Sequence, residues 1–307
     1  MKEVLVQELI DYADLEILAG KDGVNRKITD EEITSPGVEF AGFFDYFYPE
    51  RIILIGSKEA KFIYQMAEDK RASILETLFK KSPAALVFSR NVNVHNMFID
   101  LGNKFNIAIL RSDLRTTPLT SKLFTFLRER LAERIGVHGV MMDINGMGTL
   151  ILGKSGIGKS ETALELIKRG HQLISDDLVE IYEKEFGTLV AVAPKTIMGF
   201  LEVRGVGIIN VIETFGIEAF RTDKTIRLVI ELEEWQDSFE YDRLGLEEKS
   251  ITYFNTELPK LTIPVKTGRN IAVVIEAAAM NQKLKYMGYN SAFDLTKNVN
   301  NVIKGGE

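Results

Sequence analysis

The stretch TLILGKSGIGKSETALELI, Thr149–Ile167, constrains the fold of this chain more than any other segment. It contains Gly153-x-x-x-x-Gly158-Lys159-Ser160, the spacing of a phosphate-binding P-loop between a strand and a helix. The glycines let backbone N–H groups point at phosphate oxygens, Lys159 adds positive charge, and Ser160 offers a hydroxyl to Mg²⁺. The alternative is a glycine-rich turn with a surface lysine. The apolar run before the loop and the helical pattern after it favour the nucleotide-binding interpretation.

Composition excludes several other classes of function. The 307 residues suggest two domains, and a net charge of −6 gives no general attraction for nucleic acid or an anionic membrane. Without cysteine there are no disulfides or thiolate metal sites, and three scattered histidines do not suggest a zinc cluster. The acidic N-terminal segment is unlike a signal peptide, and no apolar run approaches the roughly 18 residues of a membrane helix. We therefore expect a cytoplasmic protein with no nucleic-acid or membrane partner.

The first half of the chain alternates between strand and helix patterns. Apolar residues from Val4 to Leu18 have helical spacing, and three short apolar runs follow at Arg51–Gly56, Ala84–Ser89 and Asn106–Ser112. Helical stretches such as KEAKFIYQMAEDKRASILETLFKK lie between these runs. The pattern predicts a small α/β domain with mainly parallel strand pairing.

A further helix is expected to join the two halves. TSKLFTFLRERLAERIG has an apolar stripe, with Thr120 or Ser121 as its cap and Gly136 at its end. We place an N-terminal α/β domain at 1–130 and a C-terminal P-loop domain at 131–307.

In the second half, Asn145-Gly146 between two apolar runs predicts a β-hairpin whose second strand enters the P-loop. A helix is expected over Glu161–Arg169, with Gly170 at its C-terminus. The last regular element is expected to be a helix from Ile271 to Met287, with the final KGGE frayed. Further strands are predicted in HQLISDDLVEIYE, TLVAVAP, GIINVIETFG and TIRLVIELEEW.

Adjacent carboxylates, Asp176 and Asp177, end an apolar run 17 and 18 residues after Lys159. Beside a bound Mg²⁺–nucleotide they could hold the metal or accept a proton from an attacking hydroxyl. The alternative is a solvated acidic strand end.

Other candidate residues have equally simple structural explanations. Glu202 and Arg204 lie in a glycine-punctuated stretch that could be a plain turn between strands. Lys266 and Arg269 form a basic loop that could be ordinary surface. His138 could be a buried, hydrogen-bonded histidine. Similarly, Arg243 could simply pair with Glu247 on a helix.

Six segments, taken in order, closely resemble those of the HPr kinase/phosphorylase family of bacterial regulators: GVHGV, GKSGIGKSE, LISDD, LEVRGVGIINV, YDRLG and IPVKTGRN. SPGVEFAGFFDYFYPERIILIG is also similar to that family's first domain, so the resemblance covers nearly the whole chain. It implies an enzyme that uses ATP to phosphorylate a serine of HPr, a small phosphocarrier protein, in the control of sugar uptake and carbon catabolite repression. It also implies phosphorolysis of phosphoseryl-HPr to pyrophosphate, a homohexamer, and a C-terminal domain like that of phosphoenolpyruvate carboxykinase. The motifs do not say whether pyrophosphate also acts as a donor.

The same resemblance implies roles for individual residues. Asp177 is the proton acceptor in the kinase direction and the proton donor in phosphorolysis, while Ser160 and Glu202 attend Mg²⁺. His138, Lys159 and Arg243 complete the active site. The nucleotide phosphates are bound by Gly153, Lys154, Ser155, Gly156, Ile157, Gly158, Lys159 and Ser160. A segment serving both reactions includes Leu201, Val203, Arg204, Gly205 and Asn210, and one serving chiefly dephosphorylation includes Pro264, Lys266, Gly268 and Arg269.

Two other functions compete with this interpretation. A P-loop kinase for a small metabolite is disfavoured because no obvious lid or specificity loop is visible. A nucleotide-sensing regulator that transfers no phosphate is disfavoured by Asp177 and Glu202, because a sensor needs no proton acceptor.

Overall fold

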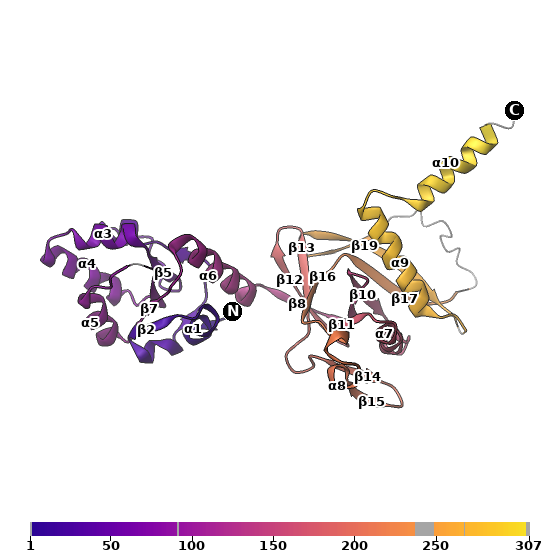
Figure 1. The fold of residues 1–307 in the computed structure, drawn as a ribbon, viewed down its shortest axis with the longest axis horizontal. Helices are drawn as coiled ribbons and strands as arrows, with labels where there is room; N and C mark the ends of the chain where they lie inside the picture. Colours follow the sequence, from indigo (N-terminus) through magenta and orange to yellow (C-terminus); the bar gives the residue numbers. More distant parts are fainter. Residues whose placement is uncertain (1, 91, 237–248, 267, 305–307) are drawn as a thin grey trace. The chain divides into compact units, whose positions relative to one another are not determined.

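The structure, a computed structural model, describes residues 2–90, 92–236, 249–266 and 268–304, with side chains to residue 297. The chain divides into two units, Met1–Ala132 and Glu133–Glu307 (Figure 1). The boundary that the sequence predicts lies between residues 130 and 131.

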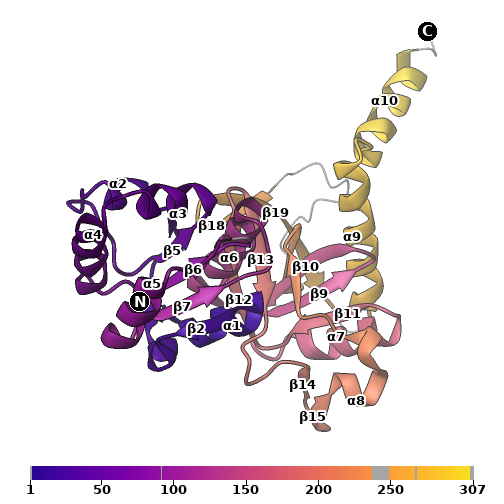
Figure 2. The ribbon, with the colours of Figure 1, turned by 60° about the vertical axis from the view of Figure 1, so that its left-hand side comes forward.

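Unit 1 is built around a five-stranded sheet. Its strands are β2 Glu16–Ala19, β4 Ile33–Thr34, β5 Ile52–Ile55, β6 Ala85–Phe88 and β7 Ala108–Arg111, and β1 Val4–Leu5 and β3 Lys27–Ile28 form a separate pair. The order is β2-β7-β6-β5-β4, with parallel pairing throughout except between β2 and β7 (Figure 2). The three predicted apolar strands are β5, β6 and β7, so the α/β prediction for this unit is confirmed.

Helices cover both faces of this sheet. They are α1 Val6–Ala13, α2 Gly37–Phe40, α3 Ser57–Tyr64, α4 Glu68–Lys80, α5 Asn96–Phe105 and α6 Thr116–Leu131, and the 3₁₀ turn η1 spans Lys21–Asn25. Alternate strand residues point to opposite faces. Ile52, Leu54 and Val87 therefore pack with α1 and α6, while Ile53 and Phe88 pack with α2 to α5. Burial on both faces explains why these strands read as continuous apolar runs.

Two predicted helices of this unit have the wrong bounds. The helix expected over Val4–Leu18 ends at Ala13, because Asp14 adopts a left-handed conformation (φ 55°) and the next residues pair with β7 as β2. The helix expected from Thr120 to Gly136 instead begins at Thr116, since Pro118 needs no backbone N–H in the first turn. It ends at Leu131 because the residues around Gly136 pair as a strand.

Unit 2 contains two sheets. The first has the order β11-β9-β10-β17-β19-β18, with β9 Val140–Ile144, β10 Met147–Gly153, β11 Gln172–Ser175, β17 Leu228–Glu234, β18 Lys249–Tyr253 and β19 Thr256–Val265. The second has the order β16-β13-β12-β8, with β8 Arg134–His138, β12 Leu178–Glu185, β13 Thr188–Val192 and β16 Asp223–Thr225. The remaining elements are the hairpin β14 Phe200–Val203 and β15 Gly207–Asn210, the helices α7 Lys159–Lys168, α8 Val211–Phe215, α9 Ile271–Tyr286 and α10 Ser291–Lys304, and the 3₁₀ turn η2 Ile217–Ala219.

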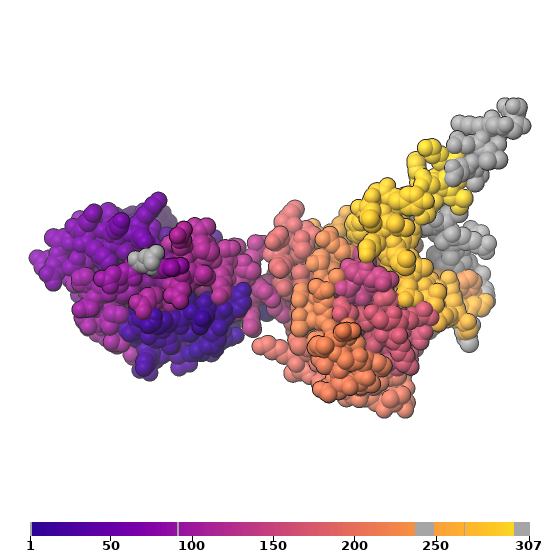
Figure 3. Space-filling view, viewed as in Figure 1, coloured from indigo at the N-terminus to yellow at the C-terminus, as the bar shows by residue number. Residues whose placement is uncertain are grey.

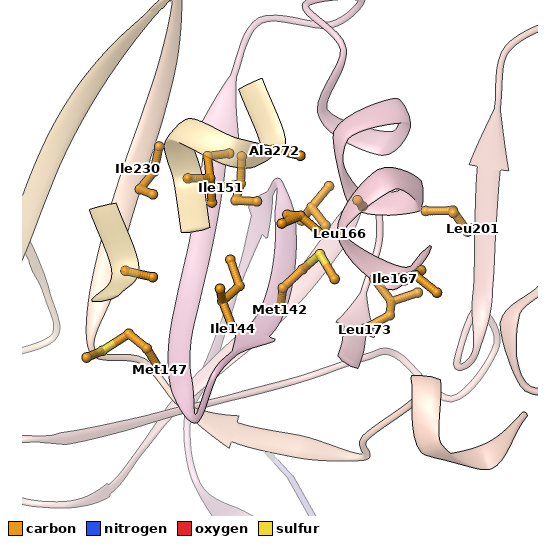
Figure 4. Close-up of a cluster of buried hydrophobic side chains, with 14 of the residues drawn as sticks. Met142, Ile144, Met147, Ile151, Leu166, Ile167, Leu173, Leu201, Ile230 and Ala272 are labelled. Carbon is orange, nitrogen blue, oxygen red and sulfur yellow. The ribbon is translucent and has the colours of Figure 1, made fainter. Parts of the chain in front are cut away.

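The six-stranded sheet is buried on both faces. Met141, Leu150 and Val229 pack against Ile181 and Leu189 of the second sheet. On the other face, Ile151 and Ile230 join Leu166 of α7 and Ala272 of α9 in a second cluster (Figure 4). This packing fixes the end of β10 and the start of α7, between which the P-loop sequence lies.

The expected hairpin is confirmed. β9 and β10 pair antiparallel, and Asn145 (φ 52°) and Gly146 (φ 87°) both have the positive φ that a type I′ turn needs. The helix α7 starts at Lys159, two residues earlier than predicted. Gly170 (φ 91°) follows its last turn, as expected.

Two other predictions in this unit are wrong. GIINVIETFG is not one strand, because the Asn210 side chain accepts hydrogen bonds from the N–H groups of Ile212 and Glu213 and starts α8. The helix α9 is not the last element, because Asn290 likewise caps a following helix, α10. Of the final KGGE, predicted to be frayed, Lys304 ends α10 and residues 305–307 lie outside the described range.

Large apolar side chains are exposed near the end of the described chain. Met280, Met287 and Phe293 are 54%, 75% and 65% exposed in the segment coloured yellow in Figure 3. Among the described residues, no helix has both the length and the apolar character needed to cross a membrane.

Candidate active site

The predicted strand, loop and helix around the P-loop sequence are confirmed as β10, residues 154–158 and α7. Gly153, Gly156 and Gly158 have φ values of 145°, 84° and 99°, which residues with a Cβ rarely adopt. At Gly153 a Cβ would also lie 2.7 Å from the Leu232 carbonyl oxygen of the neighbouring strand. The loop therefore needs its glycines for both conformation and space.

Lys159 begins α7, and its side chain turns back over the loop. Its Nζ donates to the carbonyl oxygens of Gly153 at 2.8 Å and Lys154 at 3.1 Å. Ile157 packs its side chain against the main core, while Ser155 lines the pocket above the loop. The ammonium group is thus held beside the backbone N–H groups at the helix N-terminus, a combination that favours anions.

Asp176 follows β11 and is buried, with 4% exposure. Its carboxylate accepts hydrogen bonds from Ser160 Oγ at 3.0 Å and from the backbone N–H of Glu202 at 3.0 Å. Burial raises the pKa of the Asp176 carboxyl above its usual range, and these hydrogen bonds oppose the shift. Asp176 therefore ties the start of α7 to the β14–β15 hairpin.

Asp177 has the opposite environment, although it is the next residue. Its φ of 67° turns its side chain away from the buried position, and the side chain is 79% exposed. Asp177 Oδ1 lies 3.7 Å from Nδ1 of His138, whose side chain is 82% exposed at the end of β8. The buried alternative for His138 is therefore wrong. A solvated strand end describes the exposed Asp177 but not the buried Asp176.

The stretch around Glu202 is both a turn and part of the pocket. Leu201 and Val203 point into the core, while Glu202 and Arg204 point towards the loop. Arg204 Nη2 lies 3.4 Å from Ser155 Oγ. Gly205 (φ 81°) supplies the positive φ of the turn between β14 and β15.

These groups surround one pocket that combines cations at the P-loop with carboxylates opposite. The pocket is lined by Ser155, Gly156, Gly158, Lys159, Ser160, Glu161, Asp176, Asp177, Glu202 and Arg204. Convergent charges of both signs at a helix N-terminus suit a phosphate group and a metal ion better than an apolar ligand.

The comparisons with known proteins identify the family. Residues 4–127 match the model described as HPr Serine kinase N terminus, and residues 129–299 match that of the HPr Serine kinase C-terminal domain. This chain belongs to the HPr serine kinase family. It is 46% identical to the HPr kinase/phosphorylase of Bacillus subtilis (strain 168) over 307 residues, covering 100% of this chain and 99% of that relative.

Two further proteins are similar to this chain. The HPr kinase/phosphorylase of Geobacillus kaustophilus (strain HTA426) is 44% identical over 306 residues, covering 100% of this chain and 98% of the relative. The solved structure of the Hpr(Ser) kinase/phosphatase from Coxiella burnetii is 31% identical and covers 50% of this chain and 99% of that one, with a TM-score of 0.46. Members of the HPr serine kinase family are enzymes of the kinase/phosphorylase type, as these names state.

Not every residue expected from the family resemblance lies at the pocket. Pro264 is in β19, Lys266 Nζ stacks 5.1 Å above the Trp235 ring, and Arg269 donates its backbone N–H to the carbonyl of Lys266. Gly268 has a positive φ of 85°. None of these four lines the pocket among the described residues. Arg243 lies outside the described residues, so its pairing with Glu247 does too.

The contacts that Asp176 makes were not predicted from the sequence. The family resemblance implies a role for Asp177 and none for Asp176. The signal was present: an aspartate that directly ends an apolar strand is placed at the edge of the core, where a side chain becomes buried. What could not be seen was the hairpin N–H that it binds, 26 residues further along the chain.

Proposed function

We propose that this chain is a bifunctional HPr kinase/phosphorylase. It phosphorylates a serine of HPr with ATP and removes the phosphoryl group by phosphorolysis, releasing pyrophosphate, in the control of sugar uptake and carbon catabolite repression. The observation that supports this most directly is the exposed carboxylate of Asp177 on the same pocket as Lys159 and the glycines of the loop. A pure nucleotide sensor would not need that carboxylate.

In the kinase direction the P-loop holds the nucleotide phosphates with its N–H groups and Lys159. The seryl Oγ forms a bond to the γ-phosphorus as the bond from that phosphorus to the bridging oxygen breaks. Asp177 takes the proton of the seryl hydroxyl, and His138 beside it orients the carboxylate. Phosphoryl transfer depends chiefly on such positioning and on neutralising charge.

In the opposite direction a phosphate oxygen attacks the phosphorus of phosphoseryl-HPr, and the bond from seryl Oγ to phosphorus breaks. Asp177 then returns its proton to the leaving serine oxygen, as microscopic reversibility requires. We assign Leu201, Val203, Arg204, Gly205 and Asn210 to the segment that serves both reactions. Leu201 and Val203 pack in the core, and the Asn210 side chain caps α8. These three residues therefore act by holding the hairpin in place.

The residues present fit a Mg²⁺ ion. Ser160 Oγ, the Asp176 carboxylate and Glu202 supply oxygen ligands, which this ion prefers, and a cation would offset the burial of the Asp176 charge. No group of three or more His, Asp or Glu side chains suited to a metal occurs among the described residues, so water and nucleotide phosphates would complete its shell. Mg²⁺ held by these residues would neutralise phosphate charge.

Several further assignments rest on the family. We propose a homohexamer in the cytoplasm, with a kinase/phosphorylase domain at 131–307 and an α/β domain at 1–130. Arg243 completes the active site, and Pro264, Lys266, Gly268 and Arg269 act chiefly in dephosphorylation.

The direct test is purified protein with HPr, Mg²⁺ and labelled ATP. We expect a labelled serine on HPr, and Asp177→Asn should lower the rate by about 10²–10⁴-fold, the usual contribution of a positioned general base. Glu165→Gln is a matched control, because Glu165 pairs with Arg169 on α7 outside the pocket lining.

Wild type that binds ATP but labels no HPr would remove the kinase proposal and favour a sensor. Label on a small metabolite instead would favour the small-molecule kinase. Phosphoseryl-HPr with phosphate should yield pyrophosphate; release of phosphate alone would indicate a simple phosphatase.

A further inference from the structure

Unit 1 has a polar pocket that the catalytic chemistry does not use. It is lined by Ser57, Arg90, Arg115, Thr116 and Thr117. These residues follow three neighbouring strands directly: β5 ends at Ile55, β6 at Phe88 and β7 at Arg111. Because the three strands are parallel, their carboxyl ends meet at one edge of the sheet (Figure 2).

This edge is the point where the connections change face. After β6 the chain enters α5, whose Phe98 packs with Ile53 and Phe88 on one face of the sheet. After β7 it enters α6, whose Leu123 packs on the opposite face. Adjacent parallel strands with connections to opposite faces leave a crevice at their carboxyl ends, and open α/β sheets bind ligands there.

The loops around this crevice are held together. Arg90 donates its backbone N–H to the Leu114 carbonyl at 2.8 Å. Below them, the buried Ser89 hydroxyl lies 3.0 Å from Thr116 Oγ1. A Cβ at Gly56 would come within 2.8 Å of the same Thr116 oxygen. The residue after β5 therefore packs closely against the start of α6. The pocket is therefore formed before any ligand arrives.

The charge of the pocket is positive. Among the described residues, neither the Arg90 nor the Arg115 guanidinium has a hydrogen-bond or salt-bridge partner, and no carboxylate lines the pocket. Glu59, near the end of β5, accepts a hydrogen bond from the Gly56 N–H at 3.0 Å. Two unpaired arginines in one concave site present forked donors that match a phosphoryl group.

The start of α6 adds donors to the same site. No side chain caps this 16-residue helix, and Pro118 in its first turn has no N–H. The N–H groups of Arg115, Thr116 and Thr117 are left without helical partners at that terminus, beside the two threonine hydroxyls.

We propose that this pocket binds the phosphoryl group of a small anion, either inorganic phosphate or a phosphate monoester. The hydroxyls of Ser57, Thr116 and Thr117, the backbone N–H groups at the start of α6, and the Arg90 and Arg115 guanidinium groups would donate hydrogen bonds to its oxygens. The proposal concerns unit 1 alone and stands whether or not the proposed kinase activity is found.

The test is equilibrium dialysis of the full-length protein at low salt, with the P-loop pocket filled by Mg²⁺ and a non-hydrolysable ATP analogue. Labelled inorganic phosphate and labelled glycerol 3-phosphate are the two probes. We expect one bound anion per chain, weakened about tenfold or more in Arg90→Gln/Arg115→Gln, because charge-assisted hydrogen bonds are lost. Arg128→Gln, further along α6 and outside the pocket, should bind like wild type.

Tighter binding of phosphate would identify the free ion as the ligand, and tighter binding of glycerol 3-phosphate an esterified one; either result supports the site. Both single variants are measured as well, with their melting temperatures, so that a folding defect in the double variant is recognised. The proposal would be overturned if neither probe bound wild type at concentrations below about 10 mM. It would also be overturned if wild type and every arginine variant bound the probes equally.

Discussion

Asp176 and Asp177 are consecutive residues whose carboxylates have different environments. Asp176 is buried and hydrogen-bonded to two elements, whereas Asp177 is turned into solvent beside His138. The positive φ of Asp177 separates the two side chains. One strand end thereby supplies both a structural carboxylate and a free one, and different environments suit the two groups to different roles.

At this scale Asp176→Asn should stabilise the metal-free protein at pH 8 while abolishing transfer. The folded-state pKa of Asp176 is raised, so its ionisation costs stability as the pH rises through that pKa. Asparagine avoids this cost, accepting from the Glu202 N–H and donating to Ser160 Oγ. We expect a melting temperature higher by about 2–4 °C. The difference should vanish as the pH falls through the titration of Asp176; a variant that melts lower at pH 8 would contradict the argument.

The basic segment after β19 gives a second residue-scale prediction, which rests on the proposed function. Lys266→Ala and Arg269→Ala should each impair phosphorolysis by about tenfold more than kinase activity, since only phosphorolysis must bring in free phosphate as an attacking group. Pyrophosphate release and HPr labelling are measured on the same preparation. Lys168→Ala, an exposed lysine in the last turn of α7, serves as the control. Equal losses in both directions would remove the assignment.

At the scale of elements, a polar contact adds to the apolar packing between α7 and α9. His171, 4% exposed after α7, has Nε2 2.7 Å from a Glu276 oxygen of α9, and Arg169 contacts the other oxygen at 3.2 Å. Both helices cover the face of the sheet that ends in the P-loop. The contact therefore holds the helix whose N-terminus forms the phosphate site.

Glu276→Ala should destabilise the protein by about 1–3 kcal/mol, because it leaves the buried His171 nitrogen without its partner. Denaturant unfolding measures this. Glu165→Ala removes only an exposed pair with Arg169 on the same helix and should cost about 0.5 kcal/mol or less. If both substitutions lowered the free energy of unfolding equally, the contact of His171 with Glu276 would stabilise the protein no more than the exposed pair does.

At the scale of the whole molecule, α9, the turn after it and α10 expose large apolar side chains, among them Met280, Met287 and Phe293. Large contiguous apolar surface usually marks an interface. Sedimentation should give about 208 kDa, six chains of 34.6 kDa, if the proposed hexamer is right. Met287→Glu, at a side chain that is 75% exposed, should shift the mass downwards if this surface is buried in the assembly. A monomeric mass for wild type would refute the hexamer.

The sequence alone determined the features that depend on neighbouring residues. The apolar strands β5, β6 and β7, the Asn145-Gly146 turn, and the glycine loop between β10 and α7 were predicted because local patterns and backbone preferences decide them. The family, too, followed from ordered short motifs.

Only the tertiary structure decided where elements end and which groups meet. The end of the predicted first helix is instead the strand β2, because it pairs with β7. The end of the helix predicted up to Gly136 is likewise part of β8, because it pairs with β12. The burial of Asp176, the approach of Glu202 from 26 residues away and the gathering of Arg90 and Arg115 at one sheet edge depend on contacts between distant segments. Such contacts are set by packing the whole core, which no short window of sequence contains.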